Sequence, residues 1–138
     1  MTETFLTVRY SETDRMGIVH HSRYYPWFEI ARSDFIKQIG IKYSELEEKG
    51  ILMPLVETGS RYFGSCTYED EIVIETRLVK LWPAKCEFSY NVYKLPERKL
   101  INIGKTVLGF VDTNMVPVNM KKVHPEYYNK LEGLIDKL

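Results

Sequence analysis

Apolar and polar residues alternate along several parts of the chain, which is the pattern of strands that bury one face. The alternation covers four segments, residues 5–10, 71–82, 86–95 and 100–111. In the second of these, Ile72, Ile74 and Leu78 share one face. Turns that contain Pro83 and Pro96 separate the last three segments. Short turns of this kind favour antiparallel neighbours.

A different period marks the segment that follows the first predicted strand. Trp27, Ala31 and Phe35 recur at four-residue spacing, which places them on one face of a helix. Ser22 is the predicted N-cap. Gly40 is the predicted end, because glycine adopts the left-handed conformation common after a helix. The apolar stripe is wider than a surface helix needs, so we expect a sheet to cover this helix.

Three shorter elements complete the pattern. Ser44 and Glu47 match a capping box and predict a second helix that ends at Gly50. An extended segment, residues 51–63, follows it. Pro125 is the predicted first residue of a short C-terminal helix, where its missing N–H is tolerated.

The order of these elements predicts an α+β fold, in which one curved antiparallel sheet wraps around a long central helix. The chain has 138 residues and shows no internal repeat, so we predict one domain, residues 1–138. Some predicted strands are apolar on both faces. This pattern suggests that a second subunit covers part of the sheet or its edge.

Composition narrows the range of partners. Nineteen basic and nineteen acidic residues cancel, so no overall field favours nucleic acid. Cys66 and Cys86 are interpreted as buried thiols in a reducing compartment, and the three histidines lack partners at metal-ligand spacing. Residues 1–4 do not begin a secretory signal, and no apolar run approaches the ~18 residues of a membrane span. We therefore predict a soluble, cytoplasmic protein.

The densest polar chemistry lies at the entrance of the predicted long helix, where Asp14, Gly17, His20 and His21 stand close together. A helix N-terminus leaves backbone N–H groups unpaired and favours negative charge. It can therefore stabilise an oxyanion that develops on a substrate carbonyl. The chain has no G-x-S-x-G nucleophile elbow, so we interpret this entrance as the candidate active site.

Two runs in this region carry a family resemblance: Tyr10-x-x-Thr13-Asp14-x-x-Gly17-Ile18-Val19-x-His21 and Tyr24-x-x-Trp27-Phe28-Glu29-x-Ala31-Arg32. They resemble hotdog-fold acyl-CoA thioesterases of the 4-hydroxybenzoyl-CoA thioesterase family, especially the branch with the bacterial Tol-Pal-associated enzymes. The resemblance implies that Asp14 acts on the thioester as nucleophile or general base. It also implies that the backbone N–H of His21 polarises the carbonyl.

The resemblance further implies a homodimer or homotetramer that binds acyl-CoA along the subunit interface, without a metal or organic cofactor. Gly17, Val19 and Tyr24 are predicted substrate contacts, and Arg61, or a lysine such as Lys85, is the candidate contact to the CoA phosphates. A thioester suits a site with one carboxylate, because a thiol with a pKa of about 8.5 leaves with little help from a general acid.

Several alternatives stay open at this point. Asp14 could attack the thioester directly or activate a water molecule, and Glu12 is a second candidate carboxylate. The same scaffold could carry a hydratase or dehydratase that acts on acyl thioesters through His21 and a carboxylate. It could also serve as a non-catalytic module that binds acyl-CoA.

Overall fold

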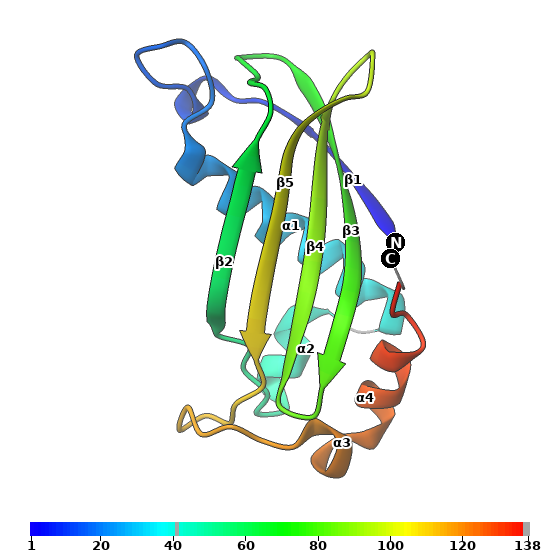
Figure 1. Cartoon of the computed structure of the whole chain (residues 1–138). Helices are drawn as coiled ribbons and strands as arrows, with labels where there is room; N and C mark the ends of the chain where they lie inside the picture. Colours follow the sequence, from blue (N-terminus) through cyan, green and yellow to red (C-terminus); the bar gives the residue numbers. More distant parts are fainter. Residues whose placement is uncertain (41, 137–138) are drawn as a thin grey trace.

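The computed structural model describes residues 1–40 and 42–136, in which a five-stranded sheet packs against one main helix (Figure 1). The sheet has the order β1-β3-β4-β5-β2, and every neighbouring pair is antiparallel. Its strands are β1 (Thr2–Thr7), β2 (Leu55–Tyr62), β3 (Glu71–Trp82), β4 (Lys85–Lys94) and β5 (Lys99–Gly109). The predicted α+β class is therefore confirmed. The last two residues of the predicted domain, 137–138, lie outside the described part.

The main helix, α1, comprises Tyr24–Ile36 and crosses one face of the sheet (Figure 1). It is shorter than the long helix predicted from Ser22 to Gly40, because the chain tightens into 3-10 turns before and after it. The turns and remaining helices are η1 (Tyr10–Glu12), η2 (His21–Arg23), η3 (Lys37–Ile39), α2 (Tyr43–Glu48), α3 (Met120–Val123) and α4 (Pro125–Glu132). Gly40 ends the helical segment at φ 85°, as predicted.

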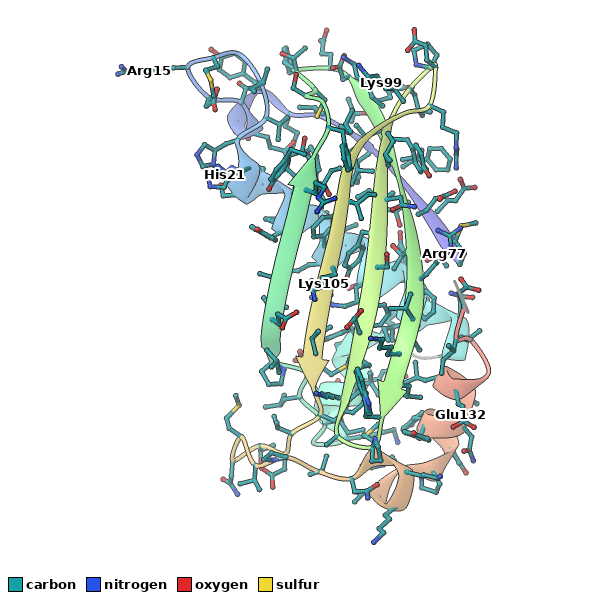
Figure 2. The ribbon with its side chains drawn as sticks, viewed as in Figure 1. Arg15, His21, Arg77, Lys99, Lys105 and Glu132 are labelled. Atoms are coloured by element: carbon teal, nitrogen blue, oxygen red, sulfur yellow. The ribbon has the colours of Figure 1, made fainter. Side chains whose placement is uncertain are left out.

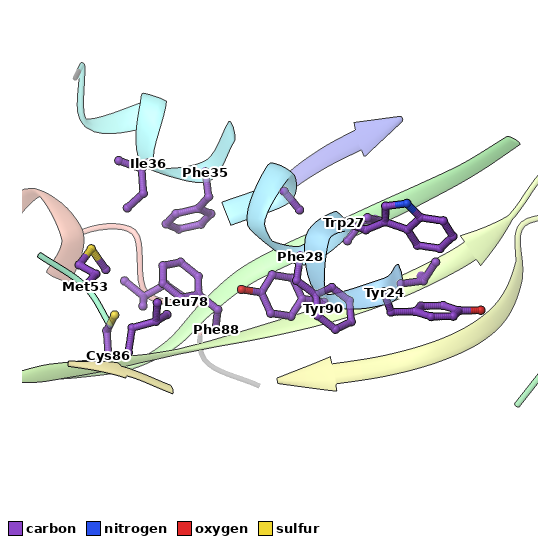
Figure 3. Close-up of a cluster of buried hydrophobic side chains, with 14 of the residues drawn as sticks. Tyr24, Trp27, Phe28, Phe35, Ile36, Met53, Leu78, Cys86, Phe88 and Tyr90 are labelled. Atoms are coloured by element: carbon purple, nitrogen blue, oxygen red, sulfur yellow. The ribbon is translucent and has the colours of Figure 1, made fainter. Parts of the chain in front are cut away.

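The core forms where α1 meets the centre of the sheet (Figure 3). Phe28 is fully buried and stacks on Tyr90 of β4, with the ring centroids 4.3 Å apart. Gly104 of β5 lies beside Tyr90 in register and provides the space for the Phe28 ring. A Cβ at this glycine would lie 2.6 Å from one Phe28 ring carbon. The missing side chain therefore lets α1 approach the sheet closely.

Element ends differ from the sequence predictions where local capping decides them. Ser22 is not the N-cap of α1, whose N-cap position is Arg23 and has no side-chain cap. Ser22 lies inside the preceding turn η2, which is capped by the His20 side chain through a hydrogen bond from the Ser22 N–H. The predicted capping box at Ser44 is also wrong. Ser44 lies inside α2, whose N-cap position is Lys42 and has no side-chain cap. The first strand ends at Thr7, before the chain turns into η1.

The strand β2 forms one edge of the sheet, where its neighbour in the strand order is β5. Large apolar side chains near its two ends are exposed, namely Leu55, Val56, Tyr62 and Phe63. An exposed apolar edge strand is a template for pairing with another chain. In residues 1–40 and 42–136, no helix combines the length and apolar character needed to cross a membrane.

Candidate active site

The loop before α1 is a tight turn closed by main-chain hydrogen bonds. Thr13 and Val19 form an antiparallel bridge. Inside it, the Asp14 N–H donates to the Ile18 carbonyl, and the Gly17 N–H donates to the Asp14 carbonyl, each at 2.9 Å. Gly17 has φ 80°, a left-handed conformation that glycine adopts without strain. The predicted turn residue is therefore required by the backbone itself.

The carboxylate of Asp14 is partly buried and held in one orientation. Its Oδ1 accepts a hydrogen bond of 2.8 Å from the Met16 N–H. The Thr67 hydroxyl donates to the Gly17 carbonyl, and the Val19 N–H donates to the Cys66 carbonyl, so the loop is tied to the segment before β3. In the described chain, no group donates a hydrogen bond to Asp14 Oδ2. One oxygen is thus fixed and the other is available.

The helix entrance follows this loop at once. The His20 Nδ1 lies 2.8 Å from the Ser22 hydroxyl, and the rings of His20 and His21 are 4.1 Å apart. The His21 side chain is exposed and points outward beside the β2 edge (Figure 2). Tyr62 donates a hydrogen bond of 3.4 Å to the His21 carbonyl. Across the described residues the His21 N–H has no acceptor, so it can donate to a ligand.

Glu12 is a structural residue rather than a free carboxylate. It is 3% exposed and accepts hydrogen bonds from the Arg9 N–H at 2.7 Å and from the Trp27 indole at 2.8 Å. The Arg9 guanidinium lies 3.5 Å from it. Both oxygens are engaged, and they fix η1 against α1. This arrangement favours Asp14 over Glu12 as the reactive group.

The nearest thiol, Cys66, is not a competing nucleophile. Burial raises the pKa of Cys66 to about 11, so its thiol is protonated at neutral pH. Burial also raises the pKa of Tyr24 well above its usual range, and this phenol lies 3.9 Å from the Cys66 sulfur. Val19 and Tyr24 both lie in the core. Their burial does not favour the predicted contact with substrate. Both side chains instead belong to the core on which the loop packs.

Arg61 is not brought to the helix entrance of its own chain. Its neighbour Tyr62 faces α1, with its ring 5.2 Å from the Tyr24 ring. Successive residues of a strand point to opposite faces, so Arg61 projects from the other face of the sheet. Its side chain is exposed. The structure thus groups Asp14, Gly17 and His21 but leaves Arg61 apart.

A cavity of about 330 Å³ lies between α1 and the edge of the sheet. Its lining comes from α1, α2, the segment before β2, β2 itself and β5: Tyr25, Glu29, Arg32, Ser33, Tyr43, Met53, Leu55, Thr58, Thr106 and Leu108. The sequence analysis missed this cavity. The only available signal was the Glu29-x-Ala31-Arg32 run, which places two charged residues beside the apolar stripe of the helix.

In the described part of the chain, no group of three histidine, cysteine, aspartate or glutamate side chains is arranged to hold a metal ion. The site therefore offers a carboxylate, a backbone donor and an adjoining cavity. These groups can polarise a carbonyl and attack its carbon, or direct water to it.

Comparison with known proteins points to one class of enzyme. Residues 8–126 match the family model of the thioesterase-like superfamily. The chain is 30% identical over 127 residues to the "Putative acyl-CoA thioesterase YneP" of Bacillus subtilis, covering 92% of both chains. It is 22% identical to the acyl-CoA thioester hydrolase YbgC of Escherichia coli over 83% of this chain and 81% of that one.

A solved structure gives the same picture. The DHNA-CoA thioesterase of Staphylococcus aureus superposes with a TM-score of 0.89 and is 28% identical to this chain. The superposition covers 96% of this chain and 91% of the other. The likeness thus extends over the sheet, α1 and the loop that carries the candidate site.

Proposed function

The chain belongs to the thioesterase-like superfamily, and from this membership we propose that it hydrolyses acyl-CoA thioesters to free CoA and a carboxylic acid. One observation carries the proposal: the available oxygen of Asp14 and the unpaired N–H of His21 flank the same helix entrance. The two runs around them support the narrower assignment to the 4-hydroxybenzoyl-CoA thioesterase family and its Tol-Pal-associated branch. A cytoplasmic location stays a prediction of the sequence.

In the proposed reaction the thioester oxygen accepts a hydrogen bond from the His21 N–H, which stabilises the developing oxyanion. Asp14 then attacks the carbonyl carbon, forms a mixed anhydride and expels the CoA thiolate, which takes a proton from solvent. Water hydrolyses the anhydride and restores the carboxylate. In the alternative route, Asp14 removes a proton from the water that attacks the carbon. Gly17 lets the substrate approach the loop backbone closely.

Thiol release from a panel of short, long and aromatic acyl-CoAs tests the proposal directly. We expect free CoA to accumulate with at least one saturated acyl-CoA. A hydratase or dehydratase would leave the thioester intact, and a binding module would bind acyl-CoA without turnover. If the folded protein released no thiol from any member of the panel, hydrolysis would be ruled out as the function.

We further propose that two copies pair through β2 and that acyl-CoA binds along the seam between them. The exposed apolar residues of β2 support this pairing, because an isolated edge of this kind invites association. The helix entrance supports it as well, since Tyr62 of β2 contacts the His21 carbonyl. Both the edge strand and the site would then lie at the seam. Two such dimers could pair again into a tetramer.

A charge on the edge strand tests this pairing. Val56 is 64% exposed on β2, so Val56→Lys is expected to leave the fold intact and to shift the protein from dimer or tetramer to monomer. Val123→Lys is the matched control, because Val123 is 56% exposed on α3, which does not lie on the β2 edge (Figure 1). Light scattering after size-exclusion chromatography gives the masses. A wild-type monomer, or an unchanged assembly in Val56→Lys, would contradict pairing through β2.

A further inference from the structure

The cavity beside α1 and the helix entrance both lie along the β2 side of the molecule. Tyr62 contacts the His21 carbonyl at the entrance. Burial raises the pKa of Tyr62, Ser60 opposes this shift, and the neighbouring Tyr25 phenol adds to it. Tyr25 is also the first lining residue of the cavity. From Tyr25 to Ser33 the cavity follows nine helical residues, a rise of about 12 Å.

Arg32 provides a buried cation in the wall of this cavity. Its side chain is 8% exposed, and its guanidinium donates a hydrogen bond of 3.1 Å to the Tyr90 hydroxyl, which is itself 2.7 Å from the Thr106 hydroxyl. The Nε atom of Arg32 is buried and has no hydrogen-bond partner. A buried donor without a partner destabilises the folded state, so it indicates a missing acceptor.

The charge of Arg32 is also incompletely balanced. In residues 1–40 and 42–136, no carboxylate lies within ion-pair distance of its guanidinium. Glu29 lines the same cavity one turn away but is exposed to solvent. Burial raises the pKa of Tyr43 to about 12, against the opposing effect of nearby Arg32. This phenol is therefore neutral at neutral pH and does not balance the charge of Arg32. A buried arginine stays charged, and an acceptor oxygen from a ligand would complete its surroundings.

We propose that this cavity receives the acyl group and that Arg32 selects substrates with an acceptor oxygen, as a hydroxyl or a carboxylate, at the end away from the thioester. The inference rests on the proposed thioesterase function and names its substrate class. The cavity volume lies near the lower end of the 300–1,000 Å³ found for small-molecule sites. It suits a compact acyl group rather than a long fatty chain. Thr58, Thr106 and Tyr43 add further polar groups to the wall.

A purely structural role for Arg32 is the competing explanation. Its hydrogen bond to Tyr90 joins α1 to β4 and would persist without any ligand. That role accounts for one edge of the guanidinium but leaves the buried Nε unexplained. The two roles predict different kinetics. A structural residue affects all substrates alike, whereas a selecting residue affects only those that carry the oxygen.

Matched substrates separate these roles in the wild-type protein. Hexanoyl-CoA, its ω-hydroxy analogue and its ω-carboxy analogue, adipoyl-CoA, differ only at the end predicted to meet Arg32. We expect kcat/KM to be about 10–100-fold higher for at least one oxygen-tipped substrate than for hexanoyl-CoA. The terminal group, hydroxyl or carboxylate, of the faster substrate identifies the acceptor. Equal or faster hydrolysis of hexanoyl-CoA would overturn the inference and leave the proposed hydrolase function standing.

Variants of Arg32 provide the second readout. Arg32→Met keeps the apolar stem and removes the hydrogen-bond donors. We expect it to lower kcat/KM about 10–100-fold for the preferred oxygen-bearing substrate, mainly by raising KM. The change for hexanoyl-CoA should be less than about threefold. Arg32→Lys keeps the charge but loses the Nε donor, and should fall between. Lys37→Met, at an exposed position on the helical segment, is the control. Equal losses for all three substrates would assign Arg32 to structure alone.

Discussion

Replacement of Asp14 by asparagine is expected to lower kcat for acyl-CoA hydrolysis by at least about 10²-fold while acyl-CoA binding is retained. Asparagine has nearly the same shape, and its side-chain oxygen can still accept the hydrogen bond from the Met16 N–H. The loop should therefore stay folded. The variant lacks the charge needed to attack the thioester and the basicity needed to activate water. Thiol-release kinetics and equilibrium binding of a non-hydrolysable acyl-CoA analogue give the two measurements.

A matched control for this variant lies at the other end of the molecule. The Asp112 Oδ1 accepts hydrogen bonds from the N–H groups of Asn114 at 2.8 Å and Val116 at 3.0 Å, in a turn like that of Asp14. Asp112→Asn should change kcat by less than about twofold, since it alters a similar turn without touching the site. If Asp14→Asn turned over at a near-normal rate, the reactive group would have to lie elsewhere.

Strand positions were predictable because burial imposes a two-residue period that can be seen in the sequence. The segment predicted at 71–82 coincides with β3, and those predicted at 86–95 and 100–111 differ from β4 and β5 by one or two residues. Helix ends were less predictable. They depend on which side chain finds a free N–H, and His20 rather than Ser22 makes that hydrogen bond.

Some features of the candidate site depend on consecutive residues, and others depend on residues that are far apart in the sequence. The turn at Gly17 and its position before the helix follow from consecutive residues, so the sequence could predict them. The buried role of Glu12 depends on Trp27, fifteen residues away, and on the register of α1. Arg61 was predicted to contact substrate. Successive side chains of β2 point to opposite faces of the sheet, so a shift of one residue along the strand would reverse the direction of this side chain. The cavity depends on five segments that only the fold brings together.

Phe28→Ala is expected to lower the free energy of unfolding by about 3–5 kcal/mol, because it removes a fully buried ring from the contact between α1 and the sheet. The ring fills the space above Gly104 and stacks on Tyr90, so its loss leaves a cavity that the rigid sheet cannot close. Chemical denaturation followed by circular dichroism measures the change. A loss below about 1 kcal/mol would contradict this packing.

A double-mutant cycle tests whether Gly104 and Phe28 share this space. Gly104→Ala alone should cost about 1–3 kcal/mol, because the added Cβ would lie 2.6 Å from a ring carbon. In the Phe28→Ala background the same Cβ enters the vacated space, so its cost should shrink or change sign. Gly59→Ala on β2 is the control, since a Cβ there meets nothing within 4 Å and should add independently. Additive losses for Gly104 and Phe28 would mean that the ring does not limit the approach of α1. Strong coupling would instead show that one glycine sets the height of the helix above the sheet, and with it the position of the helix entrance that carries the candidate site.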